Sequence, residues 1–474
     1  MEDAFGRPLY LPQSAFMRPS KDTLLSYIRE GRDMSLRDKI RLTAILSAPA
    51  MLAQLSYIVM QYIDASMVGR LGADASASIG IVSTTMWLFG GLCSSVSTGF
   101  SVQVAHAIGA NDFAGARKIL RESIFASLTF SLALMCVGLA ISPYLPVWLG
   151  GDSSICSDAS TYFLIFSLVI PLLQMNGLCS AMLRCSGNMK VPSLVNVAAC
   201  GLDVLFNWIF IYQAGLGVFG AALGTAVAEA ISAILMMSFL FVRNKDINIL
   251  RREGEHHGFV PSRKILGKAL RIGSPLGVEH LIMCGAQIMS TVIVAPLGTV
   301  AIAANSFGIT IESLCYMPGY GIAEAATTLV GQSLGAKRTP LARSFGWITV
   351  WAGIGIMTIM GIVMYVFAPA LMTLMSPDVA VQELSSEVLR IESFAEPMFA
   401  ASIVAYGVFV GAGYTIVPCA MNLTSIWLVR ITLAAILASS MGLQGVWIAM
   451  AVELCFRGVI FLLRMHSDKW SRIK

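Results

Sequence analysis

The stretch PAMLAQLSYIVMQYIDASMVGRLG, residues 49–72, decides the fold, because it is long and apolar enough to cross a bilayer. It still carries one acid, Asp64, inside the apolar run, and it begins with a proline, Pro49. A second stretch in the same frame, PLGVEHLIMCGAQIMSTVIVAPLG, occupies residues 275–298. The prolines and the closing glycines of the two stretches are both 226 residues apart (275 minus 49, 298 minus 72). These features predict a membrane-spanning chain that is built twice.

The composition of the 474-residue chain supports the membrane class. Hydrophobic residues make up 56% of it and charged residues only 12%, whereas soluble domains carry about 25% charged residues. The net charge of +5 does not indicate nucleic acid, because the basic residues lie in short loops. None of the ten cysteines forms a CxxC pair, and nearly all lie in apolar runs, so we predict no metal site and no disulfide framework.

Apolar runs of transmembrane length occur six times on each side of a basic linker. We therefore expect an all-α membrane protein with twelve helices in two six-helix lobes. Ser35 and Asp38 predict a capping box at the start of the first span. The expected parts are a lead-in (1–40), a first lobe (41–243), a linker (244–265), a second lobe (266–465) and a tail (466–474).

The distribution of lysine and arginine predicts the orientation. These residues gather in the loops after even-numbered spans, whereas the other loops carry mainly acids. Because cytoplasmic loops are enriched in basic residues, the lead-in, the linker and both termini are expected to be cytoplasmic. Residues 1–35 lack an apolar core of signal-peptide length, so we expect no cleaved signal. The apolar spans predict a multi-pass protein, which we place in the inner cell membrane.

The repeat keeps its register over the whole chain, and the matches fall on glycine and proline, which mark backbone geometry. Since each half has an even number of spans, both halves enter the membrane from the same side and the repeat is parallel. Matched positions at this separation include Gly109 with Gly335, Pro143 with Pro369, Asp152 with Asp378, Pro171 with Pro397, Gly187 with Gly413, and Pro192 with Pro418.

Ionisable residues inside the spans carry the functional prediction. A charge at the bilayer centre costs roughly 2.5–3.5 kcal/mol, and such residues usually face a cavity or a partner. In the first half, Asp64, Asp203 and Glu229 have no deep lysine or arginine to neutralise them. Asp203 and Asn207 are four residues apart and share a helix face. We interpret these residues as a site for a transported proton or Na⁺; the alternative is that Asp203 only hydrogen-bonds a neighbouring helix.

The second half mixes acids with bases and predicts a partly compensated polar core. Glu453 and Arg457, four residues apart, are expected to pair on one helix face. Arg430 is expected to need an acid, either Glu396 or Glu324. Two further assignments complete the candidates: Glu279 as an additional coupling acid, and Pro49 and Pro275 as hinges.

Three longer stretches resemble a known family. They are YIDASMVGRLGADASASIG (62–80), GFSVQVAHAIGANDFAGAR (99–117) and AEAATTLVGQSLGAKRTPLAR (323–343). Together with matches in the tenth and eleventh spans, they are similar to the multidrug and toxic compound extrusion (MATE) family over about residues 40–465.

The resemblance implies two lobes around a central cleft that opens to alternate sides, and export of organic cations driven by inward H⁺ or Na⁺. The family's first-span acid falls on Asp64, and its seventh-span acid on Glu279. In one branch the fifth span carries Asn and then Asp one turn later. Here the order is reversed, with Asp203 before Asn207, which moves the carboxylate about 6 Å along the helix.

The favoured interpretation is therefore an ion-coupled antiporter, with H⁺ favoured over Na⁺, that exports organic cations, drugs or toxic compounds. We expect a monomer in a lipid bilayer, no enzyme activity, no catalytic residue and no cofactor beyond the coupling ion. One alternative is a flippase for a polyprenyl-lipid-linked oligosaccharide, which needs a cationic cleft for pyrophosphate. Another is a non-transporting receptor or scaffold, which leaves the uncompensated acids unexplained.

Overall fold

The computed structural model describes residues 19–243 and 261–472, and all regular structure in these residues is helical. The predicted linker lies largely outside the described residues. A short helix, α1 (Lys21–Glu30), precedes two lobes. The first lobe contains α2 (Leu36–Gly69), α3 (Ala73–Gly109), α4 (Phe113–Ile141), α5 (Leu145–Trp148), α6 (Ser153–Cys185), α7 (Lys190–Trp208), η2 (Ile209–Gln213), α8 (Gly217–Ser238) and η3 (Phe239–Arg243). The second contains α9 (Arg263–Val294), η4 (Ala295–Leu297), α10 (Thr299–Gly335), α11 (Thr339–Met375), α12 (Val379–Ser393), α13 (Glu396–Gly411), α14 (Ile416–Thr424), η5 (Ser425–Ile431), α15 (Thr432–His466) and η6 (Lys469–Ser471).

The described helices account for twelve spans, which confirms the predicted architecture. Ten helical runs are long and apolar enough to cross a membrane, and α12 with α13 forms one more span that is bent by 59°. The run Ile416–His466 has 51 residues, roughly 76 Å of helix, against a hydrocarbon core of about 30 Å. Gly442 interrupts this run with φ 60° and ψ −138°. The run therefore provides two spans.

The 226-residue repeat is visible in the backbone itself. Residues in the left-handed region and side-chain helix caps recur at the same separation in both lobes. The matched pairs are Gly72 and Gly298 (φ 122° and 97°), Asn111 and Lys337 (60° and 58°), Gly187 and Gly413 (86° and 70°), and the helix-capping Asp152 and Asp378. Because the same turns occur in the same order, the two lobes share one fold.

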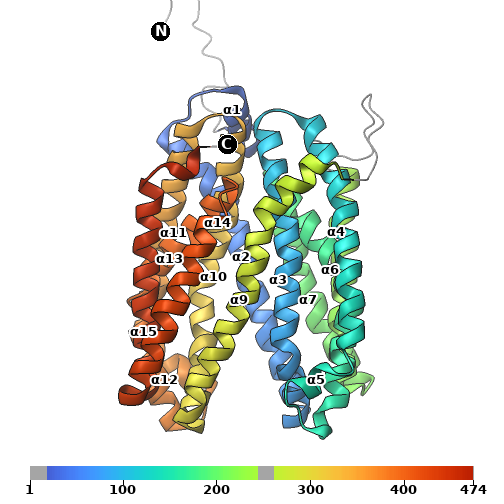
Figure 1. Cartoon of the computed structure of the whole chain (residues 1–474), viewed down its shortest axis with the longest axis vertical. Coiled ribbons are helices and arrows are strands. Elements are labelled where there is room, and N and C mark those ends of the chain that lie inside the picture. The colour runs from blue at the N-terminus through green and yellow to red at the C-terminus, as the bar shows by residue number, and fades with distance from the viewer. Residues whose placement is uncertain (1–18, 244–260, 473–474) are drawn as a thin grey trace, which may run out of the picture.

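The lobes meet at one end of the molecule and diverge towards the other (Figure 1). We call the end that carries α1 and η6 the termini end. Between the lobes, α3 packs against α9, and α2 packs against α10. The first half of α2 lies against the second lobe, where Leu42 and Leu46 join a cluster with Leu329. Its last turns lie against the first lobe, where Met67 packs with Ile211. Helix α2 therefore connects the two lobes along its length.

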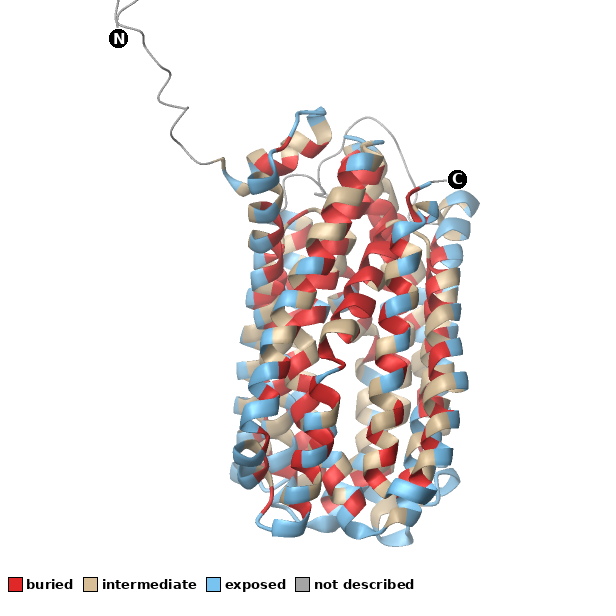
Figure 2. Cartoon of the chain, turned by 90° about the vertical axis from the view of Figure 1, so that its left-hand side faces the viewer, coloured by how far each residue is buried: buried red, intermediate tan, exposed pale blue. Residues whose placement is uncertain are grey.

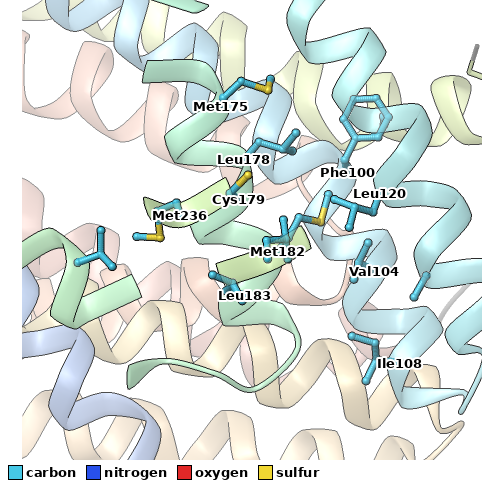
Figure 3. Packing of buried hydrophobic residues seen from close by; sticks show 14 residues of the cluster. Phe100, Val104, Ile108, Leu120, Met175, Leu178, Cys179, Met182, Leu183 and Met236 are labelled. Carbon is cyan, nitrogen blue, oxygen red and sulfur yellow. The ribbon is translucent and has the colours of Figure 1, made fainter. Parts of the chain in front are cut away.

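Close backbone approach holds helices together where lipid provides no hydrophobic drive. A Cβ added to Gly407 would lie 2.6 Å from the carbonyl oxygen of Ala323. One turn later, a Cβ added to Gly411 would lie 2.5 Å from the carbonyl oxygen of Thr327. These two glycines, four residues apart, let α13 lie directly on α10. Elsewhere larger apolar side chains fill the space, as in the first-lobe cluster around Leu178 and Met182 (Figure 3).

The outer surface of the bundle is apolar. Leu194, Leu428 and Leu463 are 71%, 69% and 65% exposed, respectively. Buried residues lie on the inward sides of the helices, and exposed ones cover the outside along the length of the bundle (Figure 2). Large exposed aliphatic side chains on long helices are the surface expected for contact with lipid.

Helix α1 lies across the termini end and contacts both lobes. Its Lys21 Nζ donates to the carbonyl oxygen of Gly187 in the first lobe, at 3.1 Å. In the second lobe, Arg338 Nη1 donates to the carbonyl oxygen of Tyr27, at 2.9 Å. After α1, Ser35 accepts from the backbone N–H of Asp38 at 3.2 Å and donates to its carboxylate at 2.7 Å, which confirms the predicted cap of the first span.

Candidate functional site

A cavity of about 340 Å³ lies between the two lobes. Its wall comes from α3, α6 and α8 of the first lobe and from α10 and α13 of the second. The wall is polar for a membrane interior: six of its seventeen lining residues carry a hydroxyl group, and three are charged. The polar lining residues are Ser94, Ser97, Thr98, Ser101, Gln174, Asn176, Arg184, Glu229, Glu324, Thr327 and Thr328.

An ion pair joins the two lobes within this cavity wall. Arg184 of α6 pairs with Glu324 of α10, and Arg184 also donates to Ser180 Oγ at 2.9 Å. Gln54 of α2 donates to the same Glu324 oxygen at 3.1 Å. Glu324 therefore binds two elements of the first lobe. This corrects the prediction that placed Glu324 in the polar core of the second lobe.

Glu229 faces the same cavity from α8. It accepts a hydrogen bond of 2.8 Å from Nδ2 of Asn176 on α6. No described lysine or arginine forms an ion pair with it. Sequence reasoning identified the acid but missed Asn176, because an amide within an apolar run gives no charge signal.

Asp64, Asp203 and Asn207 come together deep in the first lobe, although Asp64 is 143 residues from Asn207. The amide Nδ2 of Asn207 donates to Asp64 Oδ1 at 3.1 Å and to Asp203 Oδ2 at 3.2 Å. Asp203 and Asn207 are adjacent on one face of α7, because four residues make about one helical turn. Asp64 reaches them from α2, which packs against α7.

A glycine on α8 makes room for this group. A Cβ added to Gly224 would lie 2.1 Å from Asn207 Oδ1 and 2.8 Å from the Asn207 backbone nitrogen. Helices α7 and α8 therefore approach as closely as their backbones permit, and Asp203 and Asn207 are each only 2% exposed. Asp203 Oδ1 and Asn207 Oδ1 have no hydrogen-bond partner among the described residues.

This group can bind a proton. Two carboxylates that share one amide donor repel each other when both are ionised, and a proton on either removes that repulsion. No ion pair from a described base reaches Asp64 or Asp203. Within the described part of the chain, no set of three or more His, Cys, Asp and Glu residues has metal-binding geometry.

Glu279 lies in the second lobe and has two partners that sequence reasoning missed. Tyr406 of α13 donates to Glu279 Oε2 at 2.5 Å, and Asn422 of α14 donates to Oε1 at 2.7 Å. Two other spans, α13 and α14, therefore reach this carboxylate of α9. Tyr406 and Asn422 give no signal in the sequence, since each lies in an apolar run without a neighbouring charge.

The polar core of the second lobe centres on Glu453. Its carboxylate lies 2.8 Å from Arg430 Nη2 and 3.1 Å from Arg457 Nε, and it accepts from Ser425 Oγ at 2.6 Å. Ser425 and Arg430 belong to η5, a π-helical stretch whose wider turn brings residues five apart to one side. The predicted pairing of Glu453 with Arg457 is present. Arg430 pairs with Glu453 rather than with Glu396 or Glu324.

Further acids of the second lobe lie beside this core. Glu392 and Glu396 are both fully buried, and neither carboxyl group has a hydrogen-bond partner among the described residues. Glu312 of α10 is 6% exposed. Sequence reasoning missed Glu392, which lies on the buried face of α12 in helical spacing with Val381, Ser385, Val388 and Leu389.

The predicted hinges lie inside helices: Pro49 in α2 and Pro275 in α9. Of the predicted coupling residues, the structure brings Asp64, Asp203 and Asn207 together. It places Glu229 at the cavity between the lobes and Glu279 in the second lobe.

Comparisons with known proteins all indicate the same family. The MatE family model matches residues 49–209 and again residues 275–436, so the two matches begin 226 residues apart. The chain is 26% identical to a probable multidrug resistance protein NorM of Thermotoga maritima over 437 residues, which cover 90% of this chain and 92% of that protein. It is 23% identical to a protein with the same description from Neisseria meningitidis serogroup A, over 92% and 96% of the two chains.

Solved structures show the same fold. A crystal structure of MATE in complex with MaL6 superposes with a TM-score of 0.86 at 22% identity, over 94% of this chain and 99% of that one. An outward-facing multidrug resistance MATE family transporter of the MOP superfamily gives a TM-score of 0.86 at 21% identity, over 96% and 100% of the two chains.

Proposed function

We propose, from the premise that the chain belongs to the MatE family, that it is a proton-coupled antiporter that exports organic cations. Membership of this family supports export of drugs or toxic compounds. We propose in addition that the coupling ion is a proton, that the residues named below bind it, and that the cargo is an organic cation. We further propose a multi-pass monomer in the inner cell membrane with the termini end on the cytoplasmic side.

The observation that carries the proposal is the group formed by Asp64, Asp203 and Asn207. Two carboxyl groups and one amide contact one another, and no described base forms an ion pair with either carboxyl group. The group has no counterpart in the second lobe, where the repeat places Ser290, Val429 and Leu433. A feature that is absent from the other copy of the fold is not needed to build the fold. It is therefore a candidate for function.

The geometry favours a proton over Na⁺. Hard cations are bound by several oxygen atoms, but the amide N–H groups of Asn207 point at both carboxylates and occupy the position of a bridging cation. A proton needs only one carboxylate oxygen and is stabilised when a second acceptor lies nearby. Loss of contact with water also favours the neutral form of a carboxyl group.

The cavity between the lobes supports a cationic cargo. Of its three charged side chains, Arg184 and Glu324 neutralise each other. Glu229 then remains as an acid without an ion-pair partner among the described residues. A cationic group of the cargo can pair with Glu229 while hydroxyl side chains surround its polar atoms. The cavity thus provides one net negative charge for recognition.

Helix α2 provides a physical link between proton binding and lobe movement. Its first half, which contains Pro49, packs on the second lobe, and its last turns pack on the first lobe. Proline removes one helical hydrogen bond and permits bending at this point. Protonation of Asp64 would remove its negative charge and so weaken its interactions with Asp203 and Asn207 of α7. The last turns of α2 could then change their packing, with a bend at Pro49.

A transport assay tests the proposal. The protein is placed in proteoliposomes with an imposed pH gradient, and uptake of a fluorescent organic cation is followed. We expect Asp64→Asn and Asp203→Asn to lose at least ten-fold of the gradient-driven rate. The matched control is Ser290→Asn, at the repeat-related position of Asp64, and it should transport like the unaltered protein. A membrane potential supplies about 2.3 kcal/mol per charge per 100 mV, so the potential is clamped in every arm.

Two results would overturn parts of the proposal. Undiminished proton-driven uptake in both aspartate variants removes the site assignment. Uptake that follows a Na⁺ gradient and ignores pH removes the proton. The flippase alternative predicts movement of a labelled polyprenyl-linked sugar and no cation transport. The described cavity does not favour it, because its one arginine is already paired with an acid.

A further inference from the structure

Two hydrogen bonds at the termini end join the lobes in the same way. His106 Nε2 of α3 lies 2.9 Å from the carbonyl oxygen of Gly411, which ends α13. Gln332 Nε2 of α10 donates to the carbonyl oxygen of Cys185, which ends α6, at 2.8 Å. The 226-residue separation relates His106 to Gln332 and Cys185 to Gly411. The same contact is therefore made twice, once in each direction across the lobe boundary.

Both acceptors are carbonyl groups that the helix itself leaves open. The last carbonyls of an α-helix have no intrahelical donor. The backbone N–H groups that follow the ends of α6 and α13 bond to earlier residues, such as Leu183 and Phe409, and not to Cys185 or Gly411. A carbonyl oxygen can only accept, so the His106 ring nitrogen must carry the hydrogen. His106 and Gln332 thus perform one task with different chemistry.

Two glycines allow the lobes to approach at this point. A Cβ added to Gly109 would lie 2.0 Å from the carbonyl oxygen of Gln332. A Cβ added to Gly335 would lie 2.1 Å from the carbonyl oxygen of His106. These contacts are also related by the repeat, and they bring the backbones of α3 and α10 together beside the two hydrogen bonds. Any larger residue at either glycine would push the lobes apart.

We propose that these two hydrogen bonds and two glycine contacts form a clasp that keeps the termini end closed. The clasp opens each time the cavity faces that end. This inference rests on the proposed function, because it assumes that the lobes open at alternate ends. The clasp lies beyond the ion pair of Glu324 along α10, since Glu324, Thr328 and Gln332 follow one another at one-turn intervals. Thr328 Oγ1 donates to the Arg184 carbonyl at 3.2 Å, so this face of α10 contacts the first lobe over three turns.

The repeat supplies a matched set of variants. His106→Gln places the second-lobe donor in the first lobe and should preserve the clasp. His106→Leu and Gln332→Leu each remove one donor and introduce an apolar side chain of similar size. Loss of one neutral hydrogen bond shifts a two-state equilibrium by about two- to tenfold. The double variant should shift it further than either single variant, and because the two sites are close the combined effect need not equal the product.

Distances between spin labels measure this equilibrium directly. Labels are attached at Ala114→Cys and Pro340→Cys, which are exposed, repeat-related positions at the starts of α4 and α11. The background replaces the four cysteines that are not buried with serine: Cys136, Cys156, Cys200 and Cys455. The protein is studied in nanodiscs without cargo or ion gradient, so the result does not depend on transport. Circular dichroism and size-exclusion chromatography show that each variant is folded.

The expected result is a ratio of long to short distances that rises two- to tenfold in His106→Leu and in Gln332→Leu, rises further in the double variant, and is unchanged in His106→Gln. An unchanged ratio in the folded double variant overturns the clasp. So does a ratio in His106→Gln that matches His106→Leu. If the distance ratios change as expected but the protein fails the proton-driven uptake assay, the proposed proton coupling is wrong and the clasp still stands.

Discussion

Replacement of Gly224 by alanine tests whether the close contact between α7 and α8 maintains the proposed proton site. The new Cβ would lie 2.1 Å from Asn207 Oδ1, 2.8 Å from its backbone nitrogen and 3.1 Å from its Cα. Ordinary van der Waals contact for a Cβ begins near 3.4 Å. Because two of the three atoms belong to the backbone, a rotation of the Asn207 side chain cannot relieve the overlap. The helices must therefore separate by about half an ångström or more.

The expected energy has two parts. Overpacking of this kind costs about 1–3 kcal/mol, and the change from glycine to alanine within a helix returns up to about 1 kcal/mol. We therefore expect a net loss of about 0–3 kcal/mol in stability. The effect on function should be larger. The 3.1 Å bond from Asn207 to Asp64 joins α7 to α2, and it exceeds hydrogen-bonding distance if α7 shifts by half an ångström relative to α2, whereas the 3.2 Å bond to Asp203 lies within α7 and is kept.

The assay combines thermal unfolding with proton-driven uptake in proteoliposomes. Gly201→Ala on α7 is the control, because a Cβ added there has no neighbour within 4 Å. We expect Gly224→Ala to remain folded, to lose several degrees at most in Tm, and to lose most of its coupled uptake. We expect Gly201→Ala to match the unaltered protein in both measurements. Coupled uptake at the unaltered rate in Gly224→Ala would refute the reasoning that Asn207 must bridge the two aspartates.

Two further predictions concern other parts of the molecule. Glu453→Gln should cost about 3–5 kcal/mol in stability, because it leaves the buried Arg430 and Arg457 without a full counter-charge. The control is Glu396→Gln, which should change the unfolding temperature little because the Glu396 carboxyl group has no hydrogen-bond partner among the described residues. Equal losses of stability in the two variants would contradict this prediction. Arg338→Ala should increase amide hydrogen exchange in α1, because Arg338 donates to the carbonyl of Tyr27, and exchange that stays unchanged would show that apolar contacts alone hold α1.

The sequence predicted the features that depend on local pattern. Span length, the polarity of the loops and the recurrence of glycine and proline each arise from one segment at a time, so the twelve spans and the 226-residue repeat could be read directly. The group of Asp64, Asp203 and Asn207 was also found, because isolated acids are rare in apolar runs. Their spacing on α7 showed that two of them share a helix face.

The features that the sequence did not predict depend on tertiary geometry. Arg184 and Glu324 lie on different lobes, and only the docked arrangement of α6 and α10 shows that they pair. The sequence offered several acids as possible partners of Arg430. In the structure Arg430 lies in the π-helical stretch η5 and pairs with Glu453. Glu392 is buried because the face of α12 that carries it packs inward, and the sequence does not show which helices cover that face. The 226-residue separation relates His106 to Gln332, but only the structure shows that both donate to a helix-ending carbonyl of the other lobe.

The clasp has a consequence for the origin of the chain. In an interface between two identical subunits related by a twofold axis, every contact occurs twice. If one residue of the first subunit contacts another residue of the second subunit, the same two residues also meet with the subunits exchanged. The contacts of His106 and Gln332, and those of Gly109 and Gly335, follow this rule within a single chain. The boundary between the lobes therefore has the form of a homodimer interface between two six-span halves. Fusion into one chain frees each copy to change alone, which is how one lobe can carry histidine where its counterpart keeps glutamine.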